Sequence, residues 1–182
     1  MLDYFAIIND FFAANPRAYK IYLVHAVLVT HKALAIARRL NLSAESRQFI
    51  EEAAMLHDIG VIKTHDPQMD CTGDLPYIAH GLAGGQILRE KHLEKHALVA
   101  QRHIGVGLTK AEIISRNLPL PHEDFIPLSL EEKIITYADL FFSKREETLW
   151  QEDSIDRITQ ELAGFGQEQV ATFLVWHQEF GP

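Results

Sequence analysis

Apolar residues recur at helical spacing along almost the whole of this chain, and alternating β-branched runs bounded by turn residues are nearly absent. This pattern predicts an all-α fold. The chain has 182 residues, of which 47% are hydrophobic, and this is enough for one well-packed core. We therefore expect a single domain over residues 1–182.

Caps and turn residues predict where the helices begin and end. The third helix should end at the pair His57-Asp58, with Gly60 as the left-handed residue that closes it. Two capping boxes, at 109–112 and 129–132, predict two later helix starts. The other helices are expected at residues 3–14, 19–40 and 76–91, with one or two closing helices in 152–180 and loops at 61–76 and 117–127.

The balance of charge limits the partners that the chain can have. Lys and Arg number 17 against 25 Asp and Glu, so the formal net charge is −8 and a broad cationic surface for duplex nucleic acid is not expected. The single Cys71 excludes an intrachain disulfide framework and fits a reducing compartment. The most apolar run, residues 21–37, contains His31 and Lys32, so we expect a buried helix and not a membrane span. No signal peptide is visible, and a soluble cytoplasmic protein is expected.

The strongest local signal for chemistry is the pair His57-Asp58 at a predicted helix end. Both side chains can turn towards one point there, and the negative end of the helix dipole favours a cation. Taken alone, the pair is weak evidence, and a helix end that caps its own turn and meets solvent is the better interpretation.

His25 and Asp139 make a metal site the better interpretation, because both lie in strongly apolar segments. A buried imidazole needs partners for its ring nitrogens, and a buried carboxylate must be paired or bound to metal. A core hydrogen bond for His25 and an ion pair for Asp139 remain the alternatives. With His57 and Asp58 they supply two nitrogen and two oxygen ligands, a set suited to Fe, Mn, Zn or Mg.

In this order, His25, His57-Asp58 and Asp139 resemble the H…HD…D motif of the HD-domain family. The resemblance covers about residues 20–144 and includes the segments 56–60, 79–84, 102–109 and 130–134. The chain resembles the small bacterial and archaeal HDIG-type members, and the resemblance implies a helical bundle that acts as a phosphomonoesterase or phosphodiesterase. Residues 145–182 lie outside it and are expected to pack on the bundle.

The family order in two-metal relatives, H…HD…H…H…D, implies His80 and His103 as further metal ligands. One subfamily departs from this chain: the HD-GYP proteins carry a Gly-Tyr-Pro signature that is absent here and a Lys where this chain has Val61. Cleavage of cyclic di-GMP is therefore not implied.

These observations together predict a metal-dependent phosphohydrolase that uses one or two divalent ions. Asp58 would bind metal and orient the attacking water, and Lys63 and Arg102 would bind substrate phosphate, with Lys144 and Arg145 as weaker candidates. The expected substrate is a small phosphoester such as a nucleotide. No Walker loop or Gly-x-Ser-x-Gly elbow points to another mechanism.

Two other functions stay open. The domain could bind a nucleotide or a partner protein and regulate without turnover, or it could be a di-iron oxygenase on the same scaffold. His92 and His96, four residues apart, have a spacing that could bind zinc but is more typical of a solvated helix face. The oligomeric state is not indicated.

Overall fold

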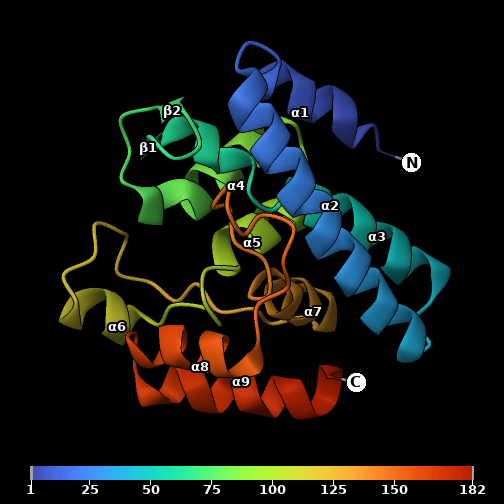
Figure 1. Cartoon of the computed structure of the whole chain (residues 1–182), viewed down its shortest axis with the longest axis vertical. Helices are drawn as coiled ribbons and strands as arrows, with labels where there is room; N and C mark the ends of the chain where they lie inside the picture. The colour runs from blue at the N-terminus through green and yellow to red at the C-terminus, as the bar shows by residue number, and fades with distance from the viewer. Residues whose placement is uncertain (1, 182) are drawn as a thin grey trace.

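The computed structural model describes residues 2–181, and helices make up most of it (Figure 1). The predicted all-α fold is confirmed. The elements are α1 (Tyr4–Phe12), α2 (Pro16–Arg39), α3 (Ala44–Leu56), the 3-10 helix η1 (Ile59–Lys63), the hairpin strands β1 (His65–Asp66) and β2 (Cys71–Thr72), the 3-10 helix η2 (Tyr77–Ala79), α4 (His80–Glu90), α5 (Glu94–Arg102), α6 (Lys110–Ser115), α7 (Leu130–Asp139), α8 (Ile155–Ala163) and α9 (Gln167–Phe180).

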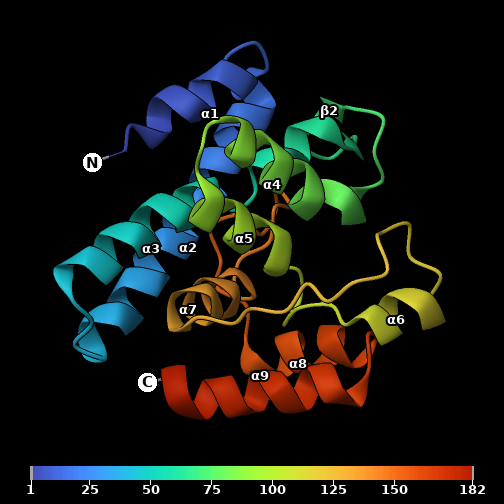
Figure 2. The same ribbon diagram turned by 180° about the vertical axis from the view of Figure 1, so that it is seen from behind.

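The long helix α2 connects the two main groups of buried residues. Side chains of its first half, such as Tyr22, belong to one buried cluster with residues of α1, the end of α3, η1, α4 and α5. Its second half packs with α3, α7 and α9 around side chains such as Ile134 and Phe173. Figure 2 shows α8 and α9 side by side beneath α7. His25 lies on α2 where these two groups of buried residues meet, so both groups pack close to it.

By length and composition α2 could also cross a membrane, since it has 24 residues and contains an apolar window of 18 residues with a mean hydropathy of 1.3. Half of that apolar window is buried inside the fold, and α2 packs against α3 and α7. Core helices of soluble proteins pass the same test of length and composition.

The helix starts follow the caps in the sequence. Asn15 accepts a hydrogen bond from the Ala18 amide, and Pro16 takes the first helical position, so α2 begins three residues earlier than expected. The capping box at Thr109 is complete. At Ser129 only half of the box forms, because the Glu132 carboxylate accepts from the Leu128 amide instead.

Gly60 has a different purpose from the one expected. It lies within η1 and does not adopt a positive φ, so it is not a left-handed helix end. A Cβ on Gly60 would lie 2.0 Å from the carbonyl oxygen of His80 and 2.2 Å from the amide nitrogen of Gly84. Glycine is therefore needed for backbone contact between η1 and α4. This contact brings the start of α4, with His80, close to Asp58.

Candidate metal centre

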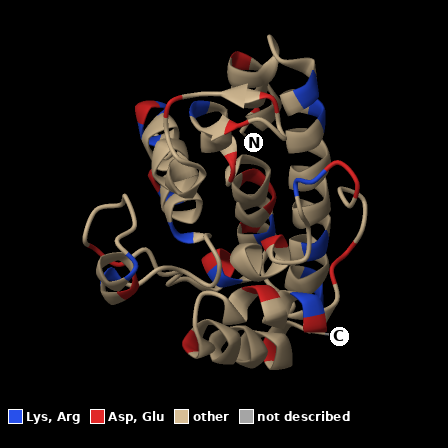
Figure 3. Cartoon of the chain, turned by 60° about the vertical axis from the view of Figure 1, so that its left-hand side comes forward, with Lys and Arg blue, Asp and Glu red and all other residues tan. Residues whose placement is uncertain are grey.

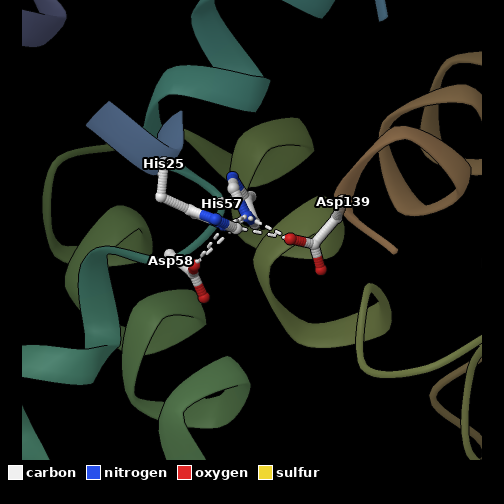
Figure 4. A group of neighbouring side chains, drawn as sticks. All are labelled: His25, His57, Asp58 and Asp139. Carbon is white, nitrogen blue, oxygen red and sulfur yellow. Dashed lines mark hydrogen bonds and ion pairs between the residues drawn. The ribbon is translucent and has the colours of Figure 1, made fainter. Parts of the chain in front are cut away.

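Four predicted ligands from three helical segments converge in the interior (Figure 4). The Nε2 atom of His25, on α2, lies 3.1 Å from Oδ2 of Asp58 and 3.0 Å from Oδ1 of Asp139, at the end of α7. The Nε2 atom of His57 lies 3.2 Å and 3.4 Å from the same two oxygens. These four residues offer ligand atoms within 4.8 Å of one another.

A second group shares Asp58 with the first. His80 begins α4 and His103 follows the end of α5, and their Nε2 atoms lie 3.0 Å apart. Each of these nitrogens is 3.3 Å from Oδ1 of Asp58. Asp58 therefore faces one group with Oδ2 and the other with Oδ1. The structure brings together all six residues that the sequence proposed as metal ligands.

Backbone carbonyls orient three of the imidazoles. Each ring places Nδ1 against the carbonyl oxygen three residues earlier, at 2.6 Å for His57, 2.7 Å for His80 and 2.8 Å for His103. A carbonyl only accepts, so Nδ1 carries the proton and a neutral ring keeps its lone pair on Nε2, towards the centre. Nδ1 of His25 has no such partner among the described residues. Metal-binding histidines are oriented by hydrogen bonds of this kind.

The centre is buried and its atoms satisfy one another poorly. His25, His57 and Asp58 are fully buried, and the Nε2 atoms of His25 and His57 face each other at 3.3 Å. Neither Asp58 oxygen makes a hydrogen bond of acceptable geometry within residues 2–181. Asp58 is held by charge, from the Lys144 ammonium 2.6 Å from its Oδ2, and a divalent cation would satisfy the ring lone pairs and the carboxylates together. The donor set therefore fits a divalent metal.

The neighbouring charges keep both carboxylates ionised. Burial alone raises the pKa of Asp58, but the charges of Lys144 and His57 hold it well below its usual range. The pKa of Asp139 is lowered against burial in the same way, first by Lys144. Burial alone lowers the pKa of His57, but Asp58 and Asp139 raise it to about 10. A metal ion would therefore displace a proton from His57 when it binds.

Lys144 is the cation that reaches the centre. Its Nζ atom lies 2.6 Å from Oδ2 of Asp58, and its side chain is only 14% exposed. Sequence reasoning ranked Lys144 below Lys63 and Arg102. Lys144 follows Asp139 by five residues, just beyond the end of α7, and this short distance in sequence is the signal that favours it as a cation near the site.

The two cations proposed to bind substrate phosphate have other neighbours. Nη1 of Arg102 is paired with Oε2 of Glu132 at 3.0 Å. Nζ of Lys63 lies 6.0 Å from the centre of the Phe11 ring, and Lys63 lines a separate cavity with Gln86. Neither forms an ion pair with the six ligand candidates in the described part of the chain.

The spacing of His92 and His96 does not create a shared site. His92 lies in the turn after α4 with a positive φ of 59°, while His96 is on α5. Nε2 of His96 lies 3.5 Å from Oε2 of Glu52, and its side chain is 11% exposed, so the expected solvated face is wrong for His96.

A cavity of about 500 Å³ adjoins the centre. Asp139 and Lys144 line it on the side of the centre, Tyr77 and Gln68 come from the segment between η1 and α4, and Arg145 belongs to the segment after α7. A small molecule in this cavity would meet Asp139, one of the six candidate ligands, and three cationic side chains, those of Lys144, Arg145 and Arg157.

Comparisons with known proteins agree with this geometry. The HD domain family model matches residues 22–142. An uncharacterized protein of Methanocaldococcus jannaschii is 44% identical over 103 residues, which is 55% of this chain and 53% of that protein. The chain thus spans about half the length of this relative.

Two further relatives are named tRNA (cytidine(56)-2'-O)-methyltransferase. The protein from Picrophilus torridus is 35% identical over 94 residues, covering 51% of this chain and 24% of its own length. The protein from Thermoplasma volcanium is 29% identical over 124 residues, covering 67% of this chain and 32% of its own length. This chain therefore matches only a part of each of them.

The fold itself is similar to that of the HD domain of the L. monocytogenes phosphodiesterase PgpH. The TM-score is 0.51 with 19% sequence identity, covering 87% of this chain and 86% of the other. The match of the family model over 22–142 contains all six converging residues. The chain belongs to the HD-domain family.

Proposed function

We propose that this chain is a metal-dependent phosphohydrolase that cleaves a small phosphoester, such as a nucleotide, in the cavity beside Asp139 and Lys144. The observation that carries the proposal is the convergence of four imidazoles and two carboxylates in two groups that share Asp58. Membership of the HD-domain family supports the same reaction class.

The ligand groups favour two ions. His25, His57 and Asp139 would hold one ion, His80 and His103 the other, and Asp58 would bridge them because its two oxygens face different groups. When bound, such ions lower the pKa of a water molecule and offset charge on phosphoryl oxygens.

The protein's own residues position the reactants. The Nδ1 hydrogen bonds of His57, His80 and His103 fix the three rings. Asp58 would orient the attacking water, and Lys144 with Arg145 would attract the phosphate from the cavity. Acidic and basic residues are interspersed along the helices (Figure 3), which suits a small substrate better than a long nucleic acid.

The test is a panel of substrates with Mn, Fe, Mg or Zn added separately to metal-free protein. The panel contains nucleoside monophosphates, cyclic nucleotides, short oligoribonucleotides, p-nitrophenyl phosphate and bis(p-nitrophenyl) phosphate. We expect metal-dependent phosphate ester cleavage that Asp58→Asn abolishes and His92→Ala, the matched surface variant, retains.

Other results would favour the alternatives. Nucleotide binding by metal-loaded protein with no cleavage of any ester would support a regulatory module. Dioxygen consumption by the iron-loaded protein would support an oxygenase.

A further inference from the structure

Lys144 occupies a position that a metal ion would need. Its ammonium contacts Oδ2 of Asp58, the same oxygen that faces His25 and His57. A lysine ammonium has only donors and cannot ligate a metal. A metal bound to this oxygen would therefore meet a like charge unless the ammonium moves.

We propose that Lys144 is an internal counter-cation that competes with the metal for Asp58 and must leave Oδ2 before the group of His25, His57 and Asp139 can bind an ion. This inference concerns metal binding and does not depend on which ester, if any, the protein cleaves.

The segment that carries Lys144 has room for this movement. Residues 140–154 connect α7 to α8 without a regular helix. Phe141 and Leu149 are buried on either side, while residues 145–147 between them are exposed. Lys144 itself lines the 500 Å³ cavity, so its ammonium can turn away from Asp58 while the two buried anchors stay in place.

The displaced ammonium would still have suitable neighbours. The same cavity is lined by the carboxylate of Asp66. If the proposed function holds, a substrate phosphate would lie in the same cavity. Binding of the metal would then release the Lys144 ammonium towards the phosphate. This cation would therefore be available to the substrate only when metal is bound.

A permanent ion pair is the alternative and makes the opposite prediction. If Lys144 stayed on Asp58 and held the carboxylate in place for the metal, removal of the lysine charge would weaken metal binding. If the ammonium competes, its removal strengthens binding.

The first experiment compares Mn²⁺ affinity in calorimetric titrations of chelator-treated protein. Lys144→Met keeps an unbranched side chain without the charge, and Lys20→Met makes the same substitution at a lysine whose side chain is 61% exposed. We expect Mn²⁺ to bind at least tenfold more tightly to Lys144→Met and within twofold of the unmutated affinity in Lys20→Met. Unchanged or weaker binding by Lys144→Met would overturn the inference.

The second experiment uses the unmutated protein, so it does not depend on how a variant folds. Lysines are acetylated with an N-hydroxysuccinimide ester with and without Mn²⁺, and the modified peptides are quantified by mass spectrometry. We expect labelling of Lys144 to rise at least fivefold with Mn²⁺, while Lys20, whose side chain is 61% exposed, stays constant.

Equal protection of Lys144 with and without Mn²⁺, or no Mn²⁺ binding at all, would refute the inference. Neither measurement contains a substrate. If no ester in the panel is cleaved but labelling of Lys144 still rises with Mn²⁺, the proposed function is refuted and the inference about Lys144 stands.

Discussion

The candidate metal centre and the pair of His96 with Glu52 both place an imidazole against a carboxylate in the interior, but the two carboxylates have different neighbours. Glu52 accepts hydrogen bonds from the Leu2 amide at 3.1 Å and from Gln48 at 2.8 Å, in addition to its contact with His96. Asp58 makes no hydrogen bond of acceptable geometry within residues 2–181, and four Nε2 atoms and one ammonium surround it.

The difference separates a structural carboxylate from a candidate ligand. A carboxylate that donors already satisfy has no need of a cation. Asp58 is balanced instead by the charges of Lys144 and His57, which a bound divalent cation would replace. The burial of a His and a carboxylate together is therefore a weaker sign of a metal site than the direction in which the ring nitrogens are held.

The largest effect should come from Asp58→Ala. Because Asp58 faces both ligand groups, its loss should weaken metal binding by more than roughly 100-fold. This loss is larger than the one expected when a residue that only hydrogen-bonds to a metal ligand is removed. Metal analysis and the phosphatase assay measure this, and circular dichroism should show nearly unchanged helix content. Glu52→Gln is the matched control and should keep its metal. An active, metal-loaded Asp58→Ala would show that Asp58 is no more a metal ligand than Glu52 is.

Metal binding should also depend strongly on pH. The pKa of His57 is raised to about 10, so the ring is protonated at neutral pH and must lose that proton to bind metal. Affinity should therefore rise about tenfold per pH unit, or about 100-fold from pH 6 to pH 8. Mn²⁺ titrations across this range measure the slope. A flat profile would show that His57 does not bind the metal through its protonated nitrogen.

The third effect concerns the number of ions. Fully loaded protein should contain about two ions per chain, because Asp58 presents one oxygen to each group, and His80→Ala or His103→Ala should reduce this to about one. Elemental analysis after purification with iron or manganese gives the count. One ion in the fully loaded, unmutated protein would show that His80 and His103 do not form a second site.

The smallest effect should come from the double variant His92→Ala with His96→Ala. Metal content and rate should stay unchanged, because neither residue reaches the centre. The free energy of unfolding should fall by about 1–2 kcal/mol, since His96 packs edge-on against Phe49 and Glu52 loses a partner. Chemical denaturation measures the change. Loss of metal in this variant would show that His92 or His96 takes part in metal binding.

Much of the fold follows from local features of the chain. The apolar spacing predicts helices, and the hydroxyl caps at Ser43, Thr109 and Ser129 mark helix starts that the structure contains. Cap residues act within one turn of the chain, so their effect can be read without knowledge of the fold. The purpose of Gly60 could not be read in this way, because the backbone it touches lies 20 or more residues away at His80 and Gly84.

The helical class and the residue types of the candidate centre follow from the sequence, because apolar spacing and the order of His and Asp are properties of the chain alone. Which cation reaches Asp58 depends on how the chain folds. Arg102 is neutralised by Glu132, 30 residues away, while the segment after α7 folds Lys144 back over 86 residues onto the carboxylate. Electrostatic interactions depend on distance in space and on burial, and neither is set by distance along the chain.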